Sequence, residues 1–316
     1  MHAAVVNALG EAPRYQFFPE PVLGEGEVLI DVRAAGLHPV VKALASGSHY
    51  SGKGEVQSVP GIDGVGALED GTRVFFTFVR KPWGSMCERT IAPRANCWPL
   101  PDGLDDAQAA AIANPGLSAL LSLKDRAALQ KGETVLILGA TGVAGQLAIQ
   151  VARHLGAKRV IAAGRNVEVL AVHELDAIIP LSQSEDAVRD AFVVEAEGGI
   201  DVVLDYLWGR PTELLLEAFA MGFSAKGSRP TRLIEVGESA GKSITLPGSA
   251  LRSVDLKMMG SGFGSVSLDR VMESIPTLFS LAAAGTLRVL VEPVLLAEVE
   301  TAWNRTEKGR RIVFMI

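Results

Sequence analysis

The chain has 316 residues, which is long enough for two domains. Hydrophobic residues make up 48% and charged residues 21%, as in ordinary globular proteins, and the formal net charge is −6. No basic tract occurs, so nucleic acid and anionic membranes are poor candidate partners. The N-terminus lacks a basic start followed by an apolar core, so we expect no signal peptide and a cytoplasmic location. Cys87 and Cys97 form no CxxC pair, which argues against a disulfide framework and a structural zinc site.

Strand-like segments dominate the first hundred residues. Apolar and polar residues alternate over 28–32 (VLIDV) and 73–79 (RVFFTFV), and Gly and Pro separate the short apolar runs. Many short strands at this spacing predict a β-rich, barrel-like unit. A helix is expected to begin near Leu104, where acidic residues favour a helix N-terminus. We expect the Asn-Pro-Gly sequence at 114–116 to interrupt it, and a further helix to cover 117–129.

From Thr134 onward, strand-like and helix-like segments alternate. The expected strands are 135–138, 160–163, 177–180, 201–205, 233–236 and 256–259, and the expected helices include 143–155, 166–173, 187–197 and 211–220. This alternation predicts a parallel sheet covered on both faces, as in a doubly wound dinucleotide-binding domain. One more helix is expected from Leu268 to about Ala284. The C-terminal apolar run is expected to return to the first domain.

The most informative segment is 133–166, ETVLILGATGVAGQLAIQVARHLGAKRVIAAGRN. An apolar strand-like run ends in glycines at three-residue spacing, and a helix-like segment and a second apolar run follow. A glycine turn between a strand and a helix lets the backbone approach a pyrophosphate, and the helix N-terminus offers free N–H groups to the anion. The predicted cofactor-binding residues of this turn are Gly139, Ala140, Thr141, Gly142, Val143 and Gly145. The alternative is a glycine turn that binds no nucleotide.

The end of the second strand indicates which nucleotide binds. NAD sites usually place Asp or Glu there to accept hydrogen bonds from the ribose hydroxyls. This chain has Gly164, Arg165 and Asn166 instead. We expect the glycine to leave room and the guanidinium to bind a 2′-phosphate through two hydrogen bonds, which favours NADPH over NADH. The alternative is that Arg165 is a solvated residue at a helix start.

Several segments together resemble the zinc-independent quinone oxidoreductase branch of the medium-chain dehydrogenase/reductase superfamily. They are EGEVLIDVRAAGLHP, ASGSHYSG, VPGIDGVGALEDGTRV, GSMCERTIAP, LPDGLDDAQAAAIANPGLSALLSL, the GATGVAG turn and the terminal RRIVFMI. The resemblance implies an α/β fold in which both chain ends, 1–116 and 285–316, form a GroES-like β-barrel catalytic domain. A Rossmann domain with a doubly wound parallel sheet, residues 117–284, would be inserted between them.

The zinc ligands of related enzymes are missing. Zinc-dependent relatives carry a Cys in the segment matching 34–39, and a Gly-His-Glu motif where this chain has Gly61-Ile62-Asp63. His38 is the only metal-capable side chain in the first segment. Because a catalytic zinc needs about three protein ligands, these positions cannot assemble the site, and we expect no metal.

The resemblance implies hydride transfer from NADPH to a quinone or to the β-carbon of an activated alkene. Tyr50 lies in a segment that resembles the cleft-lining Ser-Gly-x-Tyr of relatives, where a Tyr can supply the proton. One extra residue precedes it here, so His49 is an alternative. His38 replaces the Asn of many relatives, and Val41 replaces their acid. Tyr50, His49 and His38 are therefore the candidate catalytic residues. Each is alternatively a plain lining residue, because solvent can protonate a reduced quinone.

Further candidate cofactor contacts follow from the resemblance and from the ends of the expected strands, where open α/β sheets bind ligands. These residues are Asn114, Ser118, Asp205, Tyr206, Val236, Gly237, Gly262 and Phe263. For the glycines, the alternative is ordinary turn geometry.

The sequence therefore predicts an NADPH-dependent oxidoreductase with a small-molecule quinone or enone substrate. One alternative is an enoyl-thioester reductase, and another is a weakly catalytic NADPH-binding sensor or structural protein. The resemblance also implies a homodimer that pairs edge strands near 256–260.

Overall fold

A computed structural model describes residues 1–221, 230–306 and 309–316. The described chain forms two compact units. The first consists of Met1–Asn114 and Met272–Ile316, and the second of Pro115–Val271. We expected the divisions at 116/117 and 284/285. The later division falls earlier in the structure because the last helix, α7 (Leu268–Ala283), packs largely in the first unit, where Phe279 lies 4.9 Å from Phe75 between ring centroids.

The first unit is β-rich. Its seven-stranded sheet follows the order β14-β15-β3-β4-β5-β7, with β6 paired to β3, and β1 and β2 form a separate pair. The strands are β1 (His2–Val5), β2 (Arg14–Phe17), β3 (Glu27–Gly36), β4 (Asp63–Ala67), β5 (Arg73–Thr77), β6 (Arg89–Pro93), β7 (Cys97–Pro99), β14 (Leu290–Leu295) and β15 (Arg310–Met315). Over the described ranges, this path does not close into a ring. β5 ends two residues before the predicted end, because Phe78 has a φ of 55°.

The C-terminal strand returns to the first unit, as expected. β15 pairs antiparallel with β3, with Val313 opposite Gly36. The buried Arg311 donates a hydrogen bond from Nη1 to the carbonyl oxygen of Leu37 at 2.8 Å. The helix α1 (Pro39–Ser46) follows directly, with Pro39 at its first turn and Gly47 at φ 73° as its C-cap. These contacts fix the chain around His38.

The second unit contains the predicted parallel sheet. Its strands are β8 (Thr134–Leu138), β9 (Arg159–Gly164), β10 (Ala177–Pro180), β11 (Val202–Asp205), β12 (Thr231–Glu235) and β13 (Leu256–Gly260). Their order, β10-β9-β8-β11-β12-β13, is that of a doubly wound dinucleotide-binding sheet. The order reverses between β8 and β11, so ligands are expected at the carboxyl ends of these two strands.

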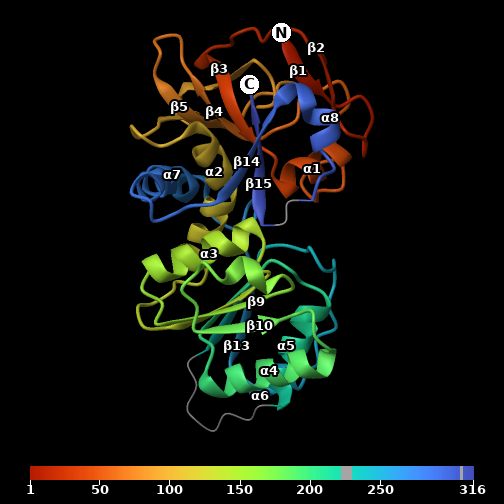
Figure 1. Cartoon of the computed structure of the whole chain (residues 1–316), viewed down its shortest axis with the longest axis vertical. Helices are drawn as coiled ribbons and strands as arrows, with labels where there is room; N and C mark the ends of the chain where they lie inside the picture. The colour runs from red at the N-terminus through yellow and green to blue at the C-terminus, as the bar shows by residue number, and fades with distance from the viewer. Residues whose placement is uncertain (222–229, 307–308) are drawn as a thin grey trace. The chain divides into compact units, whose positions relative to one another are not determined.

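Helices cover both faces of this parallel sheet (Figure 1). Figure 1 shows α3 (Val143–His154) on one side, and α4 (Glu185–Gly198) and α5 (Arg210–Met221) on the other, with the short α6 (Ala250–Ser253) next to α5. The α4–α5 side buries Phe192 and Leu215 against sheet residues such as Leu136 and Ile161. This burial explains why the strands are almost continuously apolar.

Two helix predictions were wrong. The segment predicted as helix 166–173 forms only the short 3-10 helix Val167–Leu170, since its β-branched valines lower the helix propensity and only Leu170 is buried. The helix α2 (Asp106–Leu121) runs through Pro115 without interruption. The proline costs the helix one backbone hydrogen bond, but buried residues on both sides of it keep the helix packed. It continues into a π-helical turn, Ser122–Arg126, which ends before residue 129.

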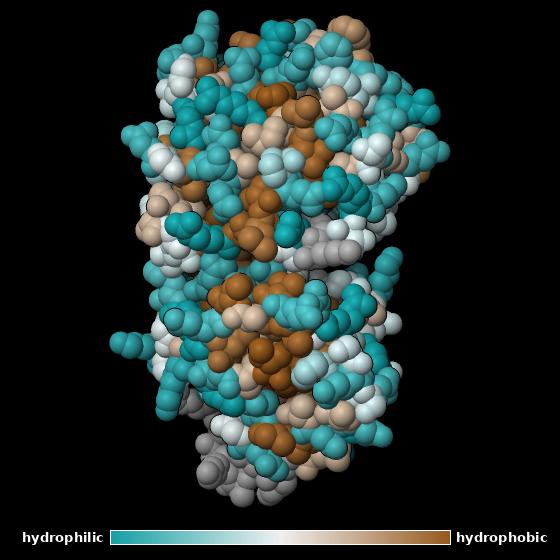
Figure 2. Space-filling view, viewed as in Figure 1, coloured by the Kyte–Doolittle hydropathy of each residue, from teal (hydrophilic) through white to brown (hydrophobic). Residues whose placement is uncertain are grey.

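The surface mixes polar and apolar residues. Figure 2 shows hydrophobic residues gathered in several places on the face in view, with hydrophilic residues between them. Among the described helices, none is both long and apolar enough to span a membrane.

Candidate functional site

The glycine turn after β8 is shaped by close backbone contacts. Gly139 has a φ of 84°, which favours glycine. A Cβ on Gly145 would lie 2.4 Å from the carbonyl oxygen of Gly139 and 2.5 Å from Cα of Ala140. Only glycine therefore allows α3 to start this close to the strand. The residues predicted from the three-residue spacing form the expected strand–turn–helix unit.

The N-terminus of α3 is open to an anion. Gly142 is the N-cap and makes no side-chain hydrogen bond to the first turn, which also contains no acidic residue. Gly142 is exposed, and a Cβ there would meet only the carbonyl oxygen of Gly139, at 3.5 Å. The first N–H groups of the helix, including that of Val143, have no capping side chain. This geometry suits a diphosphate that approaches the helix end.

The end of β9 differs in one detail from our expectation. We expected Gly164 to leave room for the nucleotide, but a Cβ there would lie 2.4 Å from Cγ2 of Thr141. Gly164 therefore makes room for Thr141. Arg165 and Asn166 are exposed. The Arg165 guanidinium makes no hydrogen bond or ion pair with the residues that the structure describes, so it is available to a phosphate.

The carboxylate of Asp205, at the end of β11, accepts three hydrogen bonds from residues that follow it in the chain. Its Oδ1 accepts hydrogen bonds from the N–H groups of Leu207 at 2.8 Å and Trp208 at 3.0 Å. Its Oδ2 accepts the Thr212 hydroxyl at 2.6 Å. Burial raises the pKa of the Asp205 carboxyl, and these three hydrogen bonds oppose that shift. Asp205 therefore organises the turn after β11, where Trp208 has a φ of 53°.

Tyr206 and Ser118 are brought together in the second unit. The Tyr206 hydroxyl is buried, and burial raises its pKa, while the nearby Ser118 hydroxyl acts in the opposite direction. The N–H groups of Val236 and Gly237 both donate to the carbonyl oxygen of Asp205, at 2.8 and 3.2 Å. The ends of β11 and β12 thus collect four of the predicted cofactor contacts.

Gly262 and Phe263 lie in the segment after β13. The N–H of Ser261 donates to the carbonyl oxygen of Glu235 at 2.7 Å, which places this segment beside the end of β12. Gly262 is exposed, and the Phe263 side chain is 55% exposed. Asn114 is half-buried on α2 and belongs to the first unit.

His38 is buried and faces a carboxylate. It precedes α1 as its N-cap residue, and its side chain has no exposed surface. Its Nε2 lies 3.5 Å from Oδ1 of Asp63, which is also buried. Asp63 opens β4 and was not among the predicted site residues. A charged residue at the start of an otherwise apolar run, IDGVGA, was the available signal.

His49 and Tyr50 lie beyond the other end of α1. Their rings are 4.3 Å apart between centroids, and His49 Nδ1 is 2.7 Å from the Ser51 hydroxyl. The Tyr50 side chain is 74% exposed, in contrast to His38. The eight residues of α1 span about 12 Å at the usual helical rise, so the structure separates His38 from the other two candidates.

No family model matches the chain. A probable NADPH-dependent quinone reductase of Emericella nidulans is 28% identical over 360 aligned residues, with 100% of both chains covered. The crystal structure of the quinone oxidoreductase from Thermus thermophilus, also determined with NADPH, shows 28% identity and a TM-score of 0.81 over 100% of both chains. This chain is similar over its full length to quinone oxidoreductases in both sequence and fold. A quinone oxidoreductase of Lama guanicoe is 33% identical over 198 residues, 59% of each chain.

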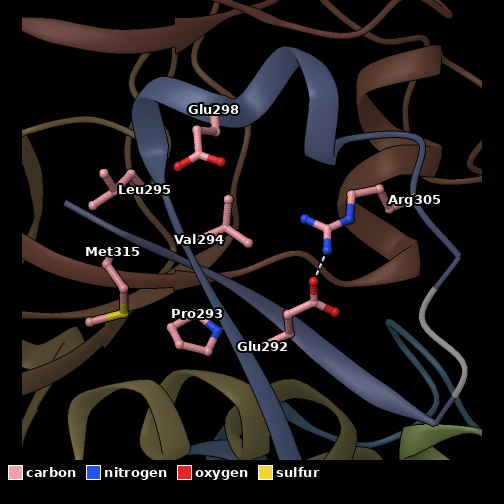
Figure 3. A pocket seen from close by; sticks show the side chains of 7 residues that line it. All are labelled: Glu292, Pro293, Val294, Leu295, Glu298, Arg305 and Met315. Atoms are coloured by element: carbon pink, nitrogen blue, oxygen red, sulfur yellow. Dashed lines mark hydrogen bonds and ion pairs between the residues drawn. The ribbon is translucent and has the colours of Figure 1, made fainter.

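An open pocket of this quinone oxidoreductase-like enzyme lies away from the predicted residues. It has a volume of about 360 Å³ and is lined by Glu292, Pro293, Val294, Leu295, Glu298, Arg305 and Met315 (Figure 3). Figure 3 shows the Arg305 guanidinium and the Glu292 carboxylate pointing toward each other as an ion pair. A partly exposed pair of this kind contributes little to stability. The pocket contains none of the candidate catalytic residues.

Potential metal ligands do not cluster among the residues of this enzyme that the structure describes. Within 1–221, 230–306 and 309–316, no group of three or more His, Cys, Asp or Glu side chains is arranged to hold a metal ion. His38 and Asp63 are two facing candidates. Ile62 stands beside them at the position where zinc-dependent relatives carry His.

Proposed function

We propose that this chain is an NADPH-dependent oxidoreductase that transfers hydride to a quinone or an α,β-unsaturated carbonyl without zinc. The observation that carries the proposal is the uncapped start of α3 behind a glycine turn, together with Arg165 at the end of the next strand, which pairs with none of the described residues. The relatives named as NADPH-dependent or determined with NADPH support the same coenzyme.

The residues of the second unit fit the coenzyme. The backbone from Gly139 to Gly145 would receive the diphosphate, because Gly142 leaves the helix N-terminus uncovered. Arg165 would bind the 2′-phosphate through a planar pair of donors. The ends of β11 and β12, with Tyr206, Val236 and Gly237, would line the nicotinamide. When bound, NADPH supplies the hydride.

The first unit would provide the acceptor side of the reaction. We propose that the first unit is the GroES-like catalytic domain. In its sheet, β3 from the N-terminal part of the chain pairs with the C-terminal strand β15. His38 would donate a hydrogen bond or a proton to the acceptor oxygen, with Asp63 facing its ring. His49 and Tyr50 would line the approach to the acceptor from the exposed side of α1. Because the sequence lacks the zinc ligands of related enzymes, the proposed hydride transfer uses no metal ion.

We further propose a homodimer. β13 pairs only with β12 among the described strands, so its other edge is open to a second copy. An enoyl-thioester reductase uses the same hydride chemistry and stays the second candidate.

A panel of acceptors tests the function and ranks these candidates. The purified chain would be assayed with NADPH and benzoquinone, naphthoquinone, alkenals, enones or an enoyl thioester. We expect turnover with a quinone or an enone. Turnover restricted to the thioester would favour the second candidate, and no NADPH oxidation with any acceptor would refute the proposal.

A further inference from the structure

The π-helical turn at the end of α2 reaches the segment that follows β13. The Ser122 hydroxyl is fully buried and donates to Oγ of Ser261 at 2.8 Å. Arg126 donates from Nε to the carbonyl oxygen of Gly260 at 2.9 Å. Two neighbouring residues at the end of β13 are therefore held by one turn of helix.

The far end of the same segment is held by the same turn. Arg270 donates from Nε and Nη2 to Oδ1 of Asp125, at 2.9 and 2.6 Å. Ser122, Asp125 and Arg126 all belong to this one π-helical turn. We call residues 260–270 the strap, because its two ends are attached to this one turn.

The strap forms a compact turn between its two attachments. The N–H of Gly262 donates to the Ser265 hydroxyl at 2.7 Å, and this hydroxyl donates back to the carbonyl oxygen of Gly262 at 2.8 Å. Gly264 has a φ of 92°, and Phe263 forms an isolated bridge with Val266. The turn thus displays Gly262 and the half-exposed Phe263 at a defined place.

We propose that Ser122, Asp125 and Arg126 are positioning residues, which hold the strap so that Gly262 and Phe263 orient the acceptor against the nicotinamide. This inference rests on the proposed function. A displacement of about 1 Å at such a position costs up to about 100-fold in rate, so weak attachments can have large kinetic effects. The Asp125–Arg270 pair is partly exposed and contributes little to global stability, which separates a kinetic role from a structural one.

The test compares Arg126→Ala, Arg270→Ala and Ser122→Ala with the wild type in the NADPH-dependent assay. Arg210→Ala is the matched control, because Arg210 is a similarly exposed arginine that pairs with carboxylates of α4 and α5 in the same unit. We expect kcat/KM for the acceptor to fall about 10-fold or more in the strap variants. The KM for NADPH and the Tm should stay close to those of the control.

Rescue distinguishes positioning from a general loss of structure. Arg126→Lys keeps a donor for the Gly260 carbonyl and should retain most of the activity. Added guanidinium should restore part of the turnover of Arg126→Ala and leave Arg210→Ala unchanged. If the wild type is active and the strap variants match the control, or lose Tm and activity together without rescue, this inference is wrong while the proposed function stands. If none of the acceptors in the panel supports NADPH oxidation by the wild type, the proposed function is wrong. This inference is then wrong as well.

Discussion

Nε2 of His38 lies 3.5 Å from Oδ1 of Asp63, and both side chains are buried in the first unit. An imidazole ring can donate a hydrogen bond or a proton to a substrate oxygen, which makes His38 a candidate donor. Tyr50, the other candidate donor, is largely exposed at the far end of α1.

Replacing His38 should affect acceptors differently. We expect His38→Asn to lower kcat for enones about 100-fold, the low end of the usual effect of a general acid. Turnover with quinones should change less, because solvent can protonate a reduced quinone. Asp63→Asn should show the same split with a smaller loss. Tyr50→Phe is the matched comparison. Equal losses with both acceptor classes in His38→Asn would show that the residue has only a packing role.

Arg165 should determine the choice of coenzyme. A charge-assisted bidentate contact with a phosphate is worth about 1.5–3 kcal/mol, or roughly 10- to 100-fold in affinity. We therefore expect Arg165→Ala to raise the KM for NADPH by about this factor and to leave the KM for NADH unchanged. Steady-state kinetics with both coenzymes measures the effect. An unchanged NADPH affinity would contradict the assignment.

Gly145 and Gly142 form a matched pair for the glycine turn. A Cβ at Gly145 would lie 2.4 Å from the Gly139 carbonyl oxygen, whereas at Gly142 the nearest contact is an ordinary 3.5 Å. We expect Gly145→Ala to lower the free energy of unfolding by about 1–3 kcal/mol, because a packed backbone must shift. Gly142→Ala should cost much less. Urea unfolding of the two variants measures this difference, and equal losses would count against the close approach.

Asp205 should make stability depend on pH. Burial raises the pKa of its carboxyl, so its contribution to stability is fully present below the unfolded value of about 3.9 and is lost as the pH rises through the folded value. Burial is the largest cause of the raised pKa of Glu235, and the charge of Asp205 is the second. Asp205→Asn therefore removes one buried carboxyl that titrates and also one cause of the raised pKa of the other. The variant should therefore gain stability relative to the wild type as the pH rises above about 4. A difference that stays constant with pH in urea unfolding would contradict this reasoning.

Metal removal should leave the activity intact. Because Ile62 cannot ligate a metal, and a catalytic zinc needs about three protein ligands, we expect dialysis against a strong chelator to change kcat by less than about twofold. Added zinc should not increase turnover. Loss of activity on chelation, with recovery on addition of zinc, would refute the metal-free mechanism.

The parts of the site that depend on local backbone rules were predictable. Gly139 and Gly145 belong to one short segment, where strand, turn and helix each leave a mark in the sequence. The doubly wound order also followed from alternating strands and helices, and the structure has it. The prediction of a helix over 166–173 was wrong, because sequence periodicity cannot show that Leu170 is the only residue of Val167–Leu170 whose side chain is buried.

Contacts between distant segments were not predictable. Asp63 faces His38 only because β4 pairs with the end of β3, and Asp205 is buried only because its turn folds over Thr212. The contact between Ser122 and Ser261 joins positions 139 residues apart. Pairings of this kind depend on tertiary packing, which one sequence does not reveal.

The most direct test of the central claim is the turnover of the purified chain with NADPH and either a quinone or an enone, followed as loss of NADPH absorbance, with NADH in parallel. We predict oxidation of NADPH, with a kcat/KM at least about 10-fold above that for NADH, because only NADPH offers Arg165 a 2′-phosphate. No oxidation of either coenzyme, or a preference for NADH, would contradict the account.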